Sequence, residues 1–94
     1  MHIEKLKNGE TFSYRPHGSS MKPKINSGDL VTVAPVDVAD VVVGDVVYCK
    51  VKGRVFLHLV TAVGDDGRFL ISNNHGHDNG WTRNIYGRVV KVEA

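Results

Sequence analysis

VVYCKVKGRVFLHLVTAV, residues 46–63, contains two apolar runs on either side of a short turn. The runs are Val46 to Val51 and Val55 to Val63, and both are rich in the β-branched and aromatic residues that favour strands. Lys52-Gly53-Arg54 separates them, and its glycine supplies the positive φ angle that a tight connection requires. This stretch therefore predicts an antiparallel hairpin.

Shorter strand patterns lie on both sides of the hairpin, each bounded by Gly, Pro, Asn or Asp. Residues 36–43 are apolar but interrupted by Asp37 and Asp40, and are expected to form a connector. No stretch carries the helical period over a useful length, so we predict an all-β fold, a small, coiled and partly closed antiparallel sheet. The further strands are expected at Thr11–Arg15, Leu30–Ala34, Phe69–Ser72 and Ile85–Val92, the last with Gly87 at a bulge or close approach.

Length and composition describe one small globular domain. The chain has 94 residues, of which 41% are hydrophobic and 23% charged, which argues against disorder. We assign one domain over residues 1–94, with a polar N-terminal segment at 1–10 and a β core at 11–94. The net charge is +2 and the basic residues are scattered, so direct contact with nucleic acid is not expected.

Targeting signals are also absent from the sequence pattern. The first nine residues hold no apolar core of a signal peptide, and no apolar run approaches the roughly 20 residues that span a bilayer. We therefore expect a cytoplasmic protein without a membrane segment of its own. Cys49, the only cysteine, excludes an intrachain disulfide and is interpreted as a small buried residue of its strand.

Three motifs follow one another along the chain. Residues 18–23 fit the pattern G-x-S-M-x-P, residues 25–33 fit I-x-x-G-D-x-V-x-V, and residues 44–47 read G-D-V-V. In this order and spacing they resemble the LexA/signal peptidase superfamily of serine peptidases, over residues from about Tyr14 to Val90. The resemblance implies a mostly β catalytic domain without a metal or other cofactor.

The resemblance also assigns the reacting groups. Ser20, the serine of the S-M pair, would attack a peptide carbonyl. Most relatives use a lysine base on a later strand, but the corresponding strand here carries His58, as in the endoplasmic-reticulum and sporulation-type signal peptidases. Those enzymes have an arginine after the histidine, where this chain has Leu59. The chain thus resembles most closely the Ser-His branch of the superfamily.

Elementary chemistry supports this pair. A serine hydroxyl is a weak nucleophile unless a neighbour takes its proton, and imidazole, with a pKa of about 6.5, can do so near neutral pH. Strand alternation places Phe56, His58 and Val60 on one face. Apolar neighbours favour the neutral imidazole, which is the form that can act as a base.

A third group would hold the histidine in the correct tautomer. Asp78 is our candidate, because residues 73–80 occupy the place of a G-D-N motif in signal peptidases, and His77-Asp78-Asn79-Gly80 is a loose version of it. Asp65, Asp66 and Asn74 remain open as alternatives.

The resemblance places the oxyanion donors on the backbone N–H of Ser20, with that of Met21 as a second donor. Gly18 lacks the hydroxyl that some signal peptidases carry two residues before the nucleophile, and Ser19 is a candidate substitute. Gly18 and Pro23 are expected to shape the turn, and Met21 to pack beneath it or to line a substrate pocket. We therefore assign Gly18, Met21 and Pro23 to substrate binding.

The resemblance implies a peptidase acting in trans on an extended peptide with small side chains near the cleaved bond. Three other functions are alternatives to it. A metal site at His75-x-His77-Asp78, with His17 or His58, lacks the spacing of known metal motifs. A catalytically inactive binding or regulatory module, of a phage type for example, stays open, as does a homodimer. Self-cleavage is not expected, because Asn8-Gly9 is the only Xaa-Gly bond before Gly18.

Overall fold

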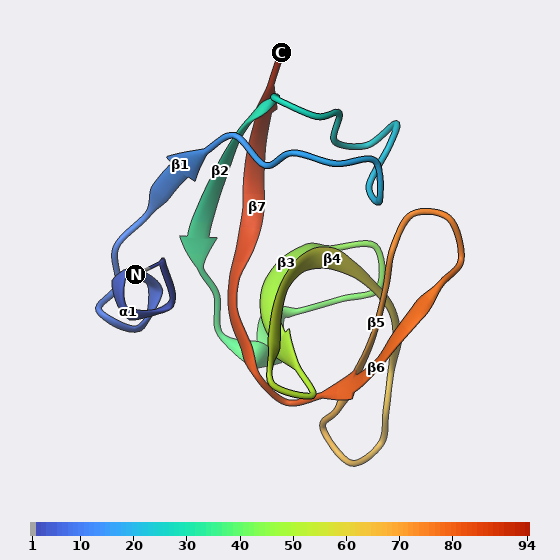
Figure 1. The fold of residues 1–94 in the computed structure, drawn as a ribbon. Coiled ribbons are helices and arrows are strands. Elements are labelled where there is room, and N and C mark those ends of the chain that lie inside the picture. Colours follow the sequence, from blue (N-terminus) through green and yellow to red (C-terminus); the bar gives the residue numbers. More distant parts are fainter. Residues whose placement is uncertain (1) are drawn as a thin grey trace.

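The computed structural model describes residues 2–94 and contains a single antiparallel sheet with a short helix beside it (Figure 1). Within these residues the strand order is β1-β2-β7-β3-β4-β5-β6, so β1 and β6 are the two edges and the sheet is open. This confirms the predicted all-β class. The strands are β1 (Phe12–Tyr14), β2 (Leu30–Pro35), β3 (Val46–Val51), β4 (Arg54–Val63), β5 (Phe69–Ser72), β6 (Asp78–Thr82) and β7 (Ile85–Glu93).

The predicted hairpin is confirmed as β3 and β4. The two strands pair from Val46 with Leu59 to Val51 with Arg54, so the turn is only Lys52-Gly53 and Arg54 already belongs to β4. Both turn residues have positive φ angles, 50° and 81°, as the tight hairpin turn that matches strand twist requires. In Figure 1, β3 to β6 curl round on one side of the molecule, whereas β1, β2 and β7 extend away from the curl.

Two elements differ from the expectation. The polar N-terminal segment contains the helix α1 (His2–Lys7), which buries Leu6 against the sheet. The predicted polar loop over residues 73–80 ends early, because β6 begins at Asp78 and pairs with β5. The connector at residues 36–43 holds one turn of 3₁₀ helix, η1 (Val38–Asp40), which is capped by the Asp37 side chain.

The buried side chains form two clusters, because alternate residues of each strand face the interior. One cluster lies within the curl and includes Val47, Cys49 and Val51 from alternate positions of β3. The other lies under β1 and β2, and takes in Met21 and Ile25 from the loop between them. This second cluster therefore anchors the loop that carries Ser20.

Gly87 on β7 is a site of close approach, as predicted. A Cβ atom at this position would lie 2.8 Å from both the Ala34 carbonyl oxygen and a Val33 methyl, and 2.9 Å from a Leu6 methyl. Only glycine lets α1, β2 and β7 approach one another so closely.

Candidate active site

Ser20 lies in the long loop between β1 and β2, which contains no strand but is fixed at several points. The N–H of Gly28 donates to the Pro16 carbonyl (2.9 Å), which closes the base of the loop. Met21 and Ile25, each 5% exposed, anchor the loop in the core. These contacts hold Ser20 above the sheet at a defined position.

His58 on β4 lies within hydrogen-bond distance of this serine. The distance from Ser20 Oγ to His58 Nε2 is 3.2 Å, although the two residues are 38 positions apart in sequence. The imidazole stacks on the Phe56 ring at 4.9 Å, on the face that strand alternation predicted. The structure thus brings the expected nucleophile and base together.

The environment of His58 favours its neutral form. Burial lowers the pKa of His58 below 6.5. The hydrogen bond to Asn79 acts in the opposite direction, and the nearby charge of His77 adds to the lowering. Because a neutral imidazole keeps one unprotonated nitrogen, His58 is available as a base at neutral pH.

Asn79, and not Asp78, contacts the other nitrogen of His58. The distance from His58 Nδ1 to Asn79 Oδ1 is 2.7 Å. A carbonyl oxygen only accepts, so Nδ1 carries the proton and donates it to Asn79, and Nε2 is left to accept from the Ser20 hydroxyl. This amide therefore selects the tautomer that a general base requires.

Asp78 lies on a different hydrogen-bond network from the one expected for it. Its carboxylate accepts from the Ser72 hydroxyl at 2.7 Å. The physical reason is a bulge in β6: Ser72 pairs with Asp78 and Ile71 pairs with Gly80, so Asn79 is an extra residue. A bulge turns a side chain out of the normal alternation, and here it directs Asn79 toward His58.

The other open alternatives for this role also lie elsewhere. Asp66 pairs with Arg68 (2.7 Å) in the turn between β4 and β5, where Asp65 also lines a surface groove. Asn74 donates from Nδ2 to the Lys22 carbonyl at 2.9 Å. Among residues 73–80, only the side-chain amide of Asn79 forms a hydrogen bond with His58. The sequence signal that pointed to this segment was its loose match to the G-D-N motif.

The carbonyl groups around the nucleophile are occupied, whereas two N–H groups are not. The Ser19 oxygen accepts from Lys22 N (3.2 Å) and from His75 Nε2 (2.8 Å), and the Ser20 oxygen accepts from Asn74 N (2.8 Å). Within residues 2–94 the N–H groups of Ser20 and Met21 donate to no protein acceptor. They are therefore available to an oxygen atom of a ligand.

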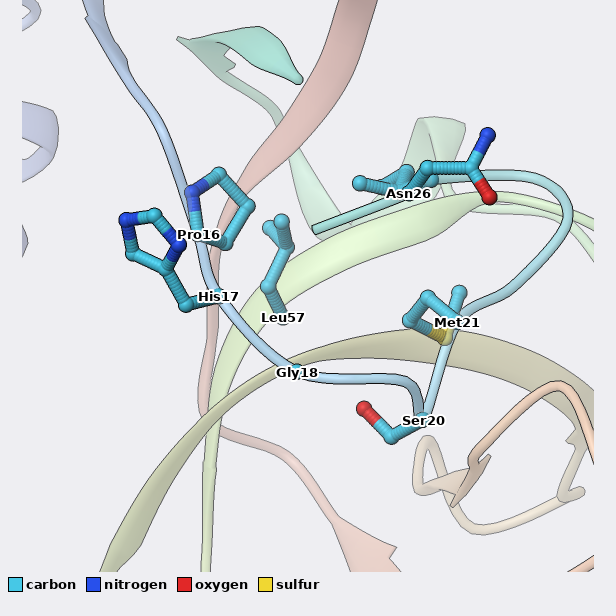
Figure 2. Close-up of a pocket in the computed structure, with 8 residues that line it drawn as sticks. Pro16, His17, Gly18, Ser20, Met21, Asn26 and Leu57 are labelled. Atoms are coloured by element: carbon cyan, nitrogen blue, oxygen red, sulfur yellow. The ribbon is translucent and has the colours of Figure 1, made fainter. Parts of the chain in front are cut away.

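A small pocket that is open to solvent lies beside Ser20. Figure 2 shows Ser20 and Met21 at one end, Pro16 and His17 at the other, and Leu57 between them. Gly18, whose φ angle of 124° suits glycine, also lines the pocket. Of the residues assigned to substrate binding, Gly18 and Met21 border this space, whereas Pro23 is not among its lining residues.

The outer edge of β4 is unpaired beside this pocket. Within residues 2–94, β5 pairs with β4 only from Leu59 to Val63, so no strand covers Arg54 to His58 on that side. In a hairpin with a two-residue turn, alternate residues direct their backbone groups away from the partner strand. Val55 and Leu57 therefore present free N–H and C=O groups next to the pocket.

Two other kinds of site receive no support from the geometry. Across the described residues 2–94, no group of three or more His, Cys, Asp or Glu side chains is arranged to hold a metal ion, the His75 to Asp78 segment included. Burial raises the pKa of the Cys49 thiol to about 12, so this cysteine is not an activated nucleophile.

A family model described as Peptidase S24-like matches residues 2–90, which is nearly the whole chain, and it confirms the resemblance to the LexA/signal peptidase superfamily. No curated protein matches the chain. In the part of the chain that the structure describes, no helix is both long and apolar enough to cross a membrane.

Proposed function

We propose, because this chain belongs to the Peptidase S24-like family, that it is a serine endopeptidase domain that cleaves an extended peptide in trans. Ser20 is the nucleophile, His58 the general base, and Asn79 the residue that orients the base. The observation that carries the proposal is the aligned set of contacts from Ser20 Oγ to His58 Nε2 (3.2 Å) and from Nδ1 to Asn79 Oδ1 (2.7 Å). Both distances lie within the range over which a proton can be transferred or held.

The reaction follows from these contacts. Ser20 Oγ forms a bond to the carbonyl carbon of the substrate as its proton passes to His58 Nε2. The same proton then goes from Nε2 to the leaving amine, and the C–N bond breaks to give an acyl-serine. Water then attacks the carbonyl carbon of the ester while His58 takes its proton. The bond from that carbon to Ser20 Oγ breaks, His58 returns the proton to Oγ, and the carboxylic acid product leaves. Asn79 takes no proton at any step.

The N–H groups of Ser20 and Met21 stabilise the negative oxygen of the tetrahedral intermediates. Such preorganised donors act where charge develops, and removing one costs about 10²- to 10³-fold in rate in other serine peptidases. Their lack of a protein acceptor within residues 2–94 supports this role. Ser19 contributes through its carbonyl, which accepts from Lys22 N and His75 Nε2 and so fixes the turn.

The substrate lies along the free edge of β4 as an additional strand. The backbone groups of Val55 and Leu57 pair with it, in the manner of other strand-adding peptide sites. The pocket beside Ser20 takes one side chain next to the cleaved bond, which the family resemblance suggests is small.

The test is covalent labelling with a small fluorophosphonate, which requires no knowledge of the substrate. We expect the wild type to be labelled at Ser20, at a rate that rises between about pH 5 and 7 as His58 loses its proton. Ser20→Ala and His58→Ala should remain folded and lose labelling. Ser13→Ala is the matched control, because Ser13 is an exposed hydroxyl that contacts Thr32 on the far edge of the sheet.

An unlabelled wild type with a native circular dichroism spectrum would contradict the proposal. The chain would then be better described as a binding module built on a peptidase fold. Labelling at a serine other than Ser20, or labelling that survives in His58→Ala at the wild-type rate, would equally exclude the mechanism.

A further inference from the structure

The loop between β5 and β6 contacts the nucleophile turn through three hydrogen bonds. His75 Nε2 donates to the Ser19 oxygen (2.8 Å), the N–H of Asn74 donates to the Ser20 oxygen (2.8 Å), and Asn74 Nδ2 donates to the Lys22 oxygen (2.9 Å). Figure 1 shows this loop beside the loop that follows β1. All three donors act on backbone carbonyls, so they fix peptide planes and not side chains.

The donating loop is itself rigidly built. Asn73 Oδ1 accepts from the N–H groups of His75 (2.8 Å) and His77 (3.0 Å), and Asn73 N donates to the His77 oxygen at 2.9 Å. An asparagine that satisfies the backbone in this way stabilises a tight loop. The loop is therefore a firm support for the turn that it contacts.

The geometry of a peptide unit connects these bonds to the free N–H groups. In a trans peptide the C=O and the N–H of one unit point in opposite directions, and among residues 2–94 only the Lys22-Pro23 bond is cis. The Ser19 carbonyl belongs to the same unit as the Ser20 N–H, and the Ser20 carbonyl to the same unit as the Met21 N–H. A hydrogen-bond donor on each carbonyl thus sets the direction of the N–H in the same peptide unit.

We propose that Asn74 and His75 are positioning residues that aim the oxyanion donors of Ser20 and Met21. This inference rests on the proposed function. His75 acts only through its Nε2–H, which the neutral ring in that tautomer and the charged ring both possess. The same loop leads into β6 and Asn79, so one segment holds both the nucleophile turn and the residue that orients the base.

The test replaces the His75 donor and then restores it. His75→Phe keeps a ring of similar size without a donor, and His75→Gln supplies an N–H in its place. We expect fluorophosphonate labelling of His75→Phe to be slower by about tenfold or more, because the rate is sensitive to the placement of oxyanion donors. His75→Gln should recover most of the rate. The pH midpoint of labelling should stay at the wild-type value, because His58 and Asn79 are untouched.

A second measurement is independent of activity. In ¹H–¹⁵N spectra, His75→Phe should shift the amide signals of Ser20 and Met21 and leave those of β3 and β7 in place. Wild-type labelling rates in His75→Phe, no recovery in His75→Gln, or a moved pH midpoint would each overturn the inference, while the proposed function would stand. If the wild type itself is not labelled, the proposed function fails and this inference fails with it.

Discussion

Replacing Asn79 by aspartate tests how the base works. The change keeps an oxygen on His58 Nδ1, 2.7 Å away, but adds a negative charge. Two unit charges about 4 Å apart attract by about 4 kcal/mol at an effective dielectric constant of 20, which equals about three pKa units. Burying the new carboxylate offsets part of this, so we expect the pKa of His58 to rise by about 1–3 units in Asn79→Asp.

The rate should change in two opposite ways. At high pH, where His58 is neutral, the carboxylate stabilises the imidazolium that forms as Ser20 is deprotonated, and about half of the pKa shift should appear as a 3- to 30-fold faster labelling. At low pH, the variant should be slower than the wild type, because its His58 is still protonated. The two pH profiles should therefore cross.

The assay is direct titration of the His58 ring by NMR, together with labelling rates from about pH 5 to 9. Asp78→Asn is the matched control, because Asp78 is adjacent in sequence but accepts from Ser72. Its pH midpoint should equal that of the wild type. A midpoint that moves in Asp78→Asn but not in Asn79→Asp would refute the reasoning and restore Asp78 as the orienting residue.

Two further predictions concern the scaffold. Gly87→Ala should lower the free energy of unfolding by about 1–3 kcal/mol, because its Cβ would lie 2.8 Å from the Ala34 oxygen; an unchanged urea midpoint would contradict this close approach. Cys49 is fully buried and burial raises its pKa to about 12, so iodoacetamide at about pH 8 should modify it only in denaturant. If the native protein were modified as fast as the denatured protein, the core cluster around Cys49 would have to open readily.

The strands that the sequence predicted are those whose side chains carry a regular pattern. Val46 to Val51 bury alternate side chains in the core, Val60 of the second run lies in the same core cluster, and Gly53 marks the turn between the two runs. The helix α1 has only six residues and one buried side chain, Leu6, which is too short a span for the helical period to be visible. β6 was not predicted because its sequence, Asp78 to Thr82, carries no alternating apolar pattern.

The presence or absence of a local sequence pattern also explains which residues of the candidate site could be predicted. Ser20 and His58 could be predicted because each is tied to a local pattern, a turn motif and a strand position. The choice between Asp78 and Asn79 depended on the pairing of β6 with β5, and a shift of one residue in a strand moves every side chain to the other face. The bulge at Asn79 is a property of that pairing, and no local pattern announces it.

The identity of the orienting residue has a consequence for the chemistry. An amide oxygen fixes the tautomer of His58 as a carboxylate would, but it supplies no negative charge to the imidazolium that forms during the reaction. Burial lowers the pKa of His58, and the hydrogen bond to Asn79 offsets this only in part. In the proposed mechanism, the site therefore combines the geometry of a triad with a base of lowered pKa. The proposed reaction then depends more heavily on how well the N–H groups of Ser20 and Met21 are aimed.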